Sequence, residues 1–174
     1  GATDTPWAGR LLADCIRDAG FPPGVFNYVT GRGSTVGEAL TSHADLAGLT
    51  FTGSYDVGMG LYRKMAGGPY PRPCITEMGG KNACVVTAHG DLERAATGIV
   101  RSAFGLTGQK CSALSRVYVE EAVAEALLAK VIEKTRAIRV GDPCIRDNWM
   151  GPVVNEAAAE AYVRYCDRLR LDGG

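Results

Sequence analysis

The sequence predicts an α/β fold in which a doubly wound, mostly parallel sheet lies between two layers of helices. Short runs of β-branched and aromatic residues alternate along the chain with longer segments whose apolar residues recur at helical spacing. The joints between these segments are short and rich in Gly and Pro. Such alternation requires crossover connections, which place helices on the faces of a parallel sheet.

The helices are recognised by apolar stripes and by residues that begin or end a helix. In the first, Pro6 lies in the first turn, Leu11 and Leu12 belong to the stripe, and Gly20 follows as a stop. Ser34 and Asp91 are expected N-caps. Helices are predicted at residues 6–19, 35–42, 57–66, 91–104, 122–138 and 156–171.

The strands are predicted where β-branched or apolar residues lie between turn signals. The segment at 141–155 has neither pattern and is expected to be irregular. Strands are predicted at residues 25–29, 46–51, 74–76, 83–86 and 116–119.

The composition excludes several classes of protein. Lys+Arg and Asp+Glu are both 19, so the formal net charge is zero, and neither nucleic acid nor an anionic membrane is expected as a partner. No apolar run approaches the roughly 20 residues that span a bilayer. The N-terminal residues also lack a signal-peptide pattern. We expect a cytoplasmic protein, or one of the mitochondrial matrix if the organism is eukaryotic.

Six cysteines accompany only two histidines, and no two cysteines have C-x-x-C spacing. No metal site is therefore expected. Cys15 and Cys166 lie on helical stripes, and Cys74 and Cys84 lie within apolar strands, so these four are expected to be buried. Cys144, in the irregular segment, is ambiguous.

Cys111 differs from the other cysteines because it lies on a polar, glycine-containing loop between a helix and a strand, directly after Lys110. A thiol beside a cation on an accessible loop is typical of a nucleophile. Glu77 ends a strand and precedes Gly79 and Gly80, which leave room for its carboxylate to swing. That placement suits a general base, although a carboxylate that only solvates a loop is the simpler reading.

Two glycine-containing joints are candidates for binding phosphate. Gly53 and Ser54 lie between a predicted strand and a predicted helix, where backbone N–H groups face the helix N-terminus. A tight turn capped by Ser54, with no ligand, explains the same residues equally simply. Gly31, Gly33 and Gly37 form a second such joint, but their spacing is not the dinucleotide fingerprint.

Three sequence blocks in fixed order resemble signatures of the aldehyde dehydrogenase superfamily. They are FTGSYDVG at 51–58, EMGGKN at 77–82 and GQKCSA at 108–113, and the segment at 21–40 is similar to the part of the family that precedes them. The third block, together with Pro71-Arg72-Pro73, is most similar to the 1-pyrroline-5-carboxylate dehydrogenase branch.

The resemblance implies a reaction and roles for individual residues. Cys111 would attack an aldehyde, Glu77 would activate the water that hydrolyses the resulting thioester, and the Cys111 N–H would form half of an oxyanion hole. NAD, with NADP as the alternative, would be the cofactor. In the branch named above, the substrate is L-glutamate γ-semialdehyde. The residues implied to bind the cofactor are Gly33, Gly53, Ser54, Met78 and Gly79.

The resemblance also implies that the chain is an internal piece of a longer, oligomeric enzyme. Residues 1–76 would be the later part of the cofactor domain, and residues 77–174 would begin the catalytic domain. Thr3 stands where the family has a glutamate that holds the cofactor ribose, which makes NADP use more plausible. The piece alone is expected to be nearly inactive.

Two rival functions remain from the residues themselves. A thiol hydrolase would need a histidine base beside Cys111, and the chain offers only His43 and His89. A truncated nucleotide-binding remnant without activity is the non-enzymatic alternative.

Overall fold

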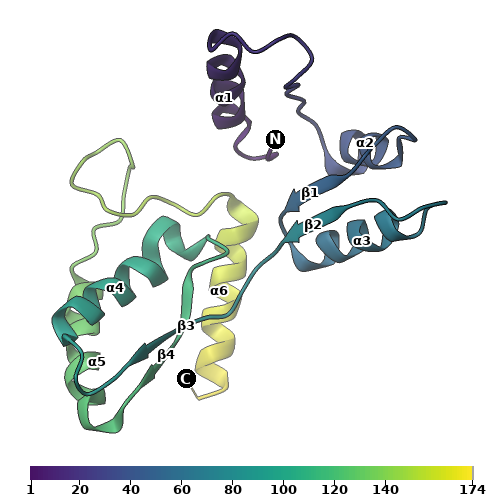
Figure 1. Cartoon of the computed structure of the whole chain (residues 1–174). Helices are drawn as coiled ribbons and strands as arrows, with labels where there is room; N and C mark the ends of the chain where they lie inside the picture. The colour runs from purple at the N-terminus through teal and green to yellow at the C-terminus, as the bar shows by residue number, and fades with distance from the viewer. Residues whose placement is uncertain (174) are drawn as a thin grey trace. The chain divides into compact units, whose positions relative to one another are not determined.

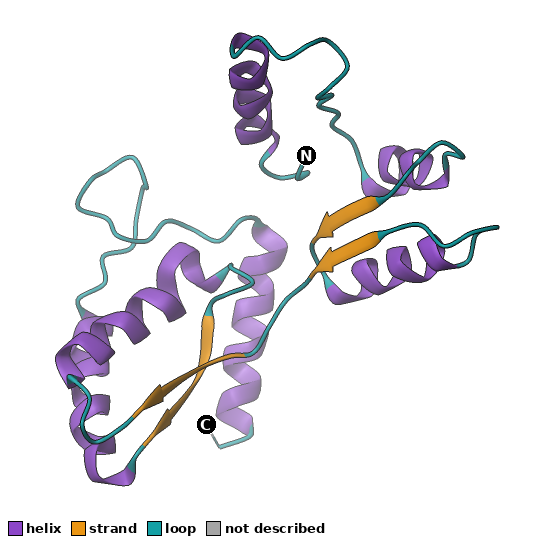
Figure 2. Cartoon of the chain, in the orientation of Figure 1, coloured by secondary structure: helices purple, strands orange, loops and turns teal. Residues whose placement is uncertain are grey.

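Two pairs of parallel strands form the sheets in the computed structural model of the chain, which describes residues 1–173 (Figure 1). The chain divides into two compact units, of which the first is Gly1–Glu77 and the second begins at Met78. Each unit has a strand–helix–strand segment whose two arrows run in the same direction (Figure 2). The expected α/β class with parallel strands is confirmed.

In the first unit, a helix connects the two strands of the pair. β1 pairs with β2 from Leu49 opposite Cys74 to Thr52 opposite Glu77. Three helices and one π-helical turn accompany the strands. The elements in order are α1 (Pro6–Asp18), the π-helical turn (Gly33–Gly37), α2 (Glu38–Ser42), β1 (Leu49–Thr52), α3 (Tyr55–Ala66) and β2 (Cys74–Glu77).

The second unit repeats the strand–helix–strand arrangement. β3 pairs with β4, and the register shifts between Asn82 and Ala83, which leaves Ser115 as an extra residue in β4. The elements in order are β3 (Asn82–Val86), α4 (Leu92–Phe104), a 3₁₀ turn (Gly105–Gly108), β4 (Leu114–Val119), α5 (Glu121–Arg136) and α6 (Glu156–Leu171).

The core of the second unit lies between β3, α4 and α5. Val86, Ala96, Ile99 and Leu127 are buried together. The predicted cap of α4 is confirmed, since an Asp91 carboxylate oxygen accepts from the backbone N–H of Glu93 at 2.9 Å and of Arg94 at 3.0 Å. This packing supports β3 and β4, both of which contact α4.

The strand predicted at residues 25–29 was wrong. The segment is irregular, and Val25, Phe26 and Val29 are exposed. A strand must pair its backbone groups with a neighbouring strand, and the described chain places none beside this segment. Apolar alternation alone does not supply that partner.

Three further expectations need correction. The helix predicted at 35–42 begins as the π-helical turn at Gly33, so Ser34 lies inside it and does not cap it. Cys15 is exposed, because the loop after α1 covers this helix only in part and none of its residues is buried. Cys74, Cys84 and Cys166 are half-buried, since the two small sheets and α6 are only partly covered.

Among the described residues, no helix is both long and apolar enough to cross a membrane.

Candidate active site

Cys111 lies at the corner of a β-turn that leads into β4. The turn is closed by a hydrogen bond from the Ala113 N–H to the Lys110 carbonyl at 3.1 Å, and the Cys111 side chain is exposed. Because the C=O and N–H of a trans peptide point in opposite directions, this bond turns the Cys111 N–H outward. Within residues 1–173 that N–H has no hydrogen-bond acceptor. One residue therefore presents both a thiol and a free donor to solvent.

The carboxamide of Asn82 ties this turn to the start of β3. Asn82 Nδ2 donates to the Cys111 carbonyl at 2.8 Å and to the Ala113 carbonyl at 3.1 Å. A Cβ added to Gly80 would lie 3.1 Å from Asn82 Oδ1 and 3.3 Å from the Cys111 carbonyl oxygen. The absence of a side chain at Gly80 therefore lets the backbone approach the carboxamide and the cysteine turn closely.

The segment before the turn has unusual backbone geometry. Leu106 and Thr107 have φ of 53° and 56°, and Gly108 has φ of 72°. Left-handed conformations cost a non-glycine residue energy and persist only where surrounding contacts hold them. Here the Gln109 side chain donates from Nε2 to the Leu106 carbonyl at 3.0 Å and accepts at Oε1 from the Val154 N–H at 2.9 Å.

Glu77 is the last residue of β2 and of the first unit. Its carbonyl accepts from the Gly53 N–H at 3.0 Å, which extends the β1–β2 pairing by one bond. The side chain is exposed, and among the described residues its carboxylate has no hydrogen-bond or ion-pair partner. Met78, half-buried, and Gly79, exposed, follow on the connection to β3.

The N-terminus of α3 follows directly after β1. Ser54 occupies the cap position, but its hydroxyl makes no capping hydrogen bond, and the first bond runs from the Gly58 N–H to the Ser54 carbonyl at 3.0 Å. The amides of the first turn have no partner within the helix. Gly53 differs, because its N–H is used by the Glu77 carbonyl and its missing side chain makes room for the Phe51 ring.

A pocket of about 430 Å³ lies in the first unit and reaches the carboxyl end of β1. Thr3, Gly33, Val36 and Thr52 are among its lining residues, and no lining residue carries a charged side chain. A cofactor pocket is expected at the carboxyl ends of parallel strands. Of the residues predicted to bind the cofactor, Gly33 alone lines this pocket.

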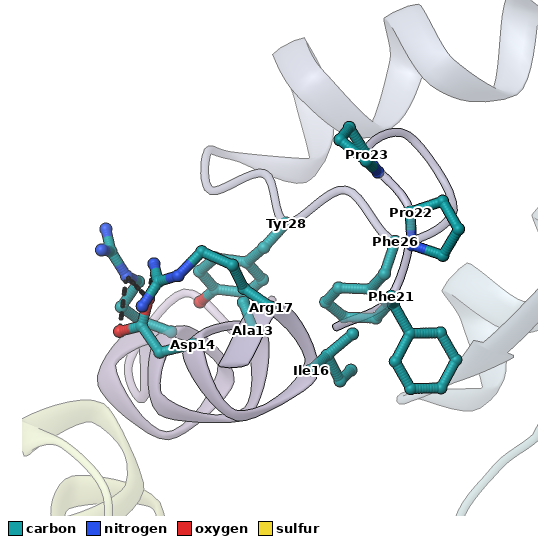
Figure 3. A pocket seen from close by; sticks show the side chains of 10 residues that line it. Ala13, Asp14, Ile16, Arg17, Phe21, Pro22, Pro23, Phe26 and Tyr28 are labelled. Carbon is teal, nitrogen blue, oxygen red and sulfur yellow. Dashed lines mark hydrogen bonds and ion pairs between the residues drawn. The ribbon is translucent and has the colours of Figure 1, made fainter. Parts of the chain in front are cut away.

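A second hollow of about 490 Å³ lies between α1 and the loop that follows it (Figure 3). Phe21, Phe26 and Tyr28 form an aromatic wall, while Asp14 is paired with Arg17 at 2.6 Å. The hydrogen bond from Arg10, followed by the contact with Arg17, lowers the pKa of Asp14 below its usual value. None of the predicted site residues lines this hollow.

The profile of the Aldehyde dehydrogenase family matches residues 1–174. The chain belongs to that family. The 1-pyrroline-5-carboxylate dehydrogenase 1 of Halalkalibacterium halodurans is 42% identical over 176 residues, which cover 99% of this chain and 34% of the relative. The chain thus spans about a third of the length of the curated relatives that it matches.

Solved structures lead to the same family. A 1-pyrroline-5-carboxylate dehydrogenase from Thermus with bound NAD superimposes with a TM-score of 0.85 at 34% identity, over 93% of this chain and 32% of that one. An NAD-dependent aldehyde dehydrogenase from Sinorhizobium meliloti gives a TM-score of 0.92 at 33% identity, over 98% and 34%. The likeness therefore extends from sequence to backbone.

Within this aldehyde dehydrogenase chain, the predicted site residues belong to both units. Gly33, Gly53, Ser54 and Glu77 lie in the first, and Met78, Gly79 and Cys111 in the second. His89 follows the carboxyl end of β3, whereas Cys111 lies beside its amino end, so a five-residue strand separates them by about 16 Å. The hydrolase alternative therefore finds no base at His89.

Sequence reasoning missed two residues that shape the site, Asn82 and Gln109. Each stood inside a recognised motif, at the end of EMGGKN and near the start of GQKCSA. Their bonding partners lie 29 and 45 positions away, at Cys111 and Val154. A polar residue inside a glycine-containing motif was the only local signal, and it does not identify a distant partner.

Proposed function

We propose that the protein to which this chain belongs oxidises an aldehyde to a carboxylic acid, with NAD or NADP as hydride acceptor and Cys111 as nucleophile. The observation that carries the proposal is the Lys110–Ala113 turn, where an exposed thiol and a free backbone N–H belong to one residue. Membership of the aldehyde dehydrogenase family supports it.

In the first step, the Cys111 thiolate attacks the carbonyl carbon, and the C=O π electrons move onto oxygen. The outward-facing N–H of Cys111 donates to the resulting oxyanion, which supplies half of an oxyanion hole. The product is a thiohemiacetal bound through the Cys111 sulfur. Because thiol and donor lie on one rigid turn, both reach the same substrate carbonyl.

In the second half of the reaction, Glu77 activates water. A dinucleotide held by Ser54 and the first-turn amides of α3 would supply the acceptor for a hydride from the substrate carbon, and a thioester on Cys111 would remain. Glu77 takes a proton from water while the water oxygen attacks the thioester carbonyl. The C–S bond then breaks, the carboxylic acid leaves, and the Cys111 thiolate is restored. The exposed, unpartnered carboxylate beside Gly79 and Gly80 is free to make that approach.

The residues of the first unit fit a dinucleotide. The Ser54 hydroxyl and the first-turn amides of α3 are donors suited to a diphosphate, whereas Gly53 shapes the turn. The pocket lined by Thr3 and Gly33 suits the adenosine end. Its lining has no carboxylate to reject a 2′-phosphate, so we propose that NADP is accepted beside NAD. Met78 and Gly79 would lie near the nicotinamide.

L-glutamate γ-semialdehyde is the proposed substrate and glutamate the product. The support is the set of relatives named 1-pyrroline-5-carboxylate dehydrogenase, at 40–42% identity.

We also propose that the whole protein is a homo-oligomer. All six cysteines are free thiols, which suits a reducing compartment such as the cytoplasm.

The decisive test is Cys111→Ser in the whole protein. NADH production from the semialdehyde should fall by about 10³-fold or more, because the hydroxyl is a far weaker nucleophile. Cys144→Ser is the matched control, since Cys144 is also an exposed loop thiol, and it should keep the wild-type rate. An unchanged rate in Cys111→Ser would refute the proposed function.

A further inference from the structure

We propose that Asn82 is a positioning residue that sets the direction of the Cys111 thiol and N–H. The inference rests on the proposed role of Cys111 as nucleophile. Asn82 does not itself reach the reacting atoms in this proposal. It acts through the backbone of the turn, by the two hydrogen bonds from Nδ2 to the carbonyls of Cys111 and Ala113.

Both peptide planes that flank Cys111 are held by separate hydrogen bonds. The bond from Ala113 N–H to the Lys110 carbonyl fixes the plane before Cys111. The bond from Asn82 Nδ2 to the Cys111 carbonyl, at 2.8 Å, fixes the plane after it. With both planes held, φ and ψ of Cys111 are set, and with them the direction of its Cα–Cβ bond. Removing the Asn82 donors releases ψ.

The surroundings hold the carboxamide in place. Asn82 is half-buried at the first position of β3, where the register shift leaves Ser115 as the extra residue. Bulges of this kind redirect side chains and end regular pairing. On the other side, the Gly80 backbone lies so close that an added methyl group would press on Asn82 Oδ1 at 3.1 Å and on the Cys111 carbonyl oxygen at 3.3 Å.

The chemistry of the contact requires a primary amide. Two carbonyl oxygens converge on one nitrogen, and an amide NH₂ offers one hydrogen to each. An aspartate has the same shape but no donor when ionised, and it places negative charge against two carbonyl dipoles. Asn82→Asp therefore removes the hydrogen bonds with little change in side-chain volume.

The experiment uses the whole protein and compares Asn82→Asp with Asn148→Asp. The control loses a similar bond, from Asn148 Nδ2 to the Asp142 carbonyl at 3.0 Å, in the irregular segment. We expect Asn82→Asp to lower kcat and the rate of the first-turnover NADH burst by about 10- to 100-fold, because misplacement of a reacting group is costly. The KM values for aldehyde and NAD should change by less than about threefold, since no substrate contact is removed. Asn148→Asp should keep the wild-type rates.

A second readout follows the thiol directly. The rate of Cys111 alkylation by iodoacetamide is the total alkylation rate minus the rate that remains in Cys111→Ser. This rate should also fall in Asn82→Asp. A merely structural role would lower the temperature of unfolding and leave the burst rate, per folded molecule, and the alkylation rate unchanged. That result would overturn the inference.

A third variant tests the same inference if Asn82→Asp does not fold. Gly80→Ala presses on the same carboxamide and should also slow the burst. A folded Gly80→Ala protein with wild-type burst and alkylation rates would contradict the inference.

The two proposals also fail separately. Loss of activity in Cys111→Ser with wild-type behaviour in Asn82→Asp removes only the role of Asn82, whereas full activity in Cys111→Ser removes the proposed function.

Discussion

Exposure of the Glu77 carboxylate, which has no partner within residues 1–173, suits it to its proposed role as the base in the second half of the reaction. Glu77→Gln should keep the first-turnover burst of NADH and slow steady-state turnover by about 10²- to 10⁴-fold, because only thioester hydrolysis needs the base. Rapid-mixing absorbance of NADH separates the two phases. Glu125→Gln, at an exposed carboxylate of α5, should leave both phases unchanged. A lost burst with Glu77→Gln would place the residue in the first step instead.

Thr3 carries the proposed tolerance for NADP. It lines the pocket of the first unit, whose lining has no charged side chain. Thr3→Glu should raise KM for NADP by about tenfold or more, since a carboxylate repels a 2′-phosphate nearby, while KM for NAD stays the same or falls. Thr3→Gln, of similar size and without the charge, is the control. Equal effects on both cofactors would mean that Thr3 is not near the 2′ position.

The N-cap of α4 shows what a local pattern can predict at the scale of an element. Asp91 accepts from two backbone amides in the first turn, at 2.9 and 3.0 Å. Asp91→Ala should lower the free energy of unfolding by about 1 kcal/mol. Urea unfolding followed by circular dichroism measures the change. Asp91→Asn, which keeps a cap acceptor, should recover most of the loss.

An ion-pair cluster joins α4 to α5 and makes the stability of this pair depend on pH. Glu93 contacts Lys134, and it lies 3.0 Å from Lys130. The hydrogen bond with Lys134, followed by that with Lys130, lowers the pKa of Glu93 below its usual value near 4.5. A lowered carboxylate pKa means that the stabilisation is complete above the usual value and is lost as pH falls through the lowered one.

Glu93→Gln tests this dependence. The variant should unfold at lower urea than the wild type at neutral pH, and the difference should shrink towards zero as pH falls through the lowered pKa of Glu93, where the wild-type carboxylate becomes protonated as well. Glu125→Gln should show no comparable difference, because Glu125 forms no ion pair with a described residue. A difference that stayed constant across this pH range would exclude the charge as its cause.

Element by element, the sequence predicted what depends on neighbours along the chain and missed what depends on distant partners. The helix predicted at 156–171 has those bounds in the structure, because its apolar stripe and Asn155 cap are local. The strand at 25–29 failed, since pairing requires a second strand. Asn82 was missed for the same reason, as its acceptors lie 29 and 31 positions away. Cys111 was found because three motifs occur in a fixed order.

The connection from Met78 to Lys81 joins β2 to β3. It begins at the carboxyl end of β2, beside Glu77, and ends at the amino end of β3, beside the Cys111 turn. A short link with two glycines thus carries the chain from the proposed base to the residue that holds the nucleophile. The motif EMGGKN at 77–82 therefore contains both the proposed base and the residue that holds the turn of the nucleophile.

For the molecule as a whole, apolar exposure predicts how the chain behaves when it is expressed alone. Trp7 is 70% exposed, Val85 73% and Leu171 87%, whereas Met65 is fully buried. Exposed apolar surface on this scale marks faces that need a cover, and the curated relatives are about three times as long as the chain. Residues 1–174 expressed alone should therefore bind a hydrophobic dye strongly and produce no measurable NADH.

The whole protein, at the same molar concentration, is the control and should bind little dye while turning over the aldehyde. The physical reason for the expected inactivity is positional. The proposed reaction requires Cys111, Glu77 and the proposed cofactor donors of α3 to keep their working geometry closely, and these residues belong to two separate units. Uncovered apolar faces leave such units free to associate wrongly. Turnover by monomeric residues 1–174, verified by light scattering, would show instead that these residues already hold a complete active site.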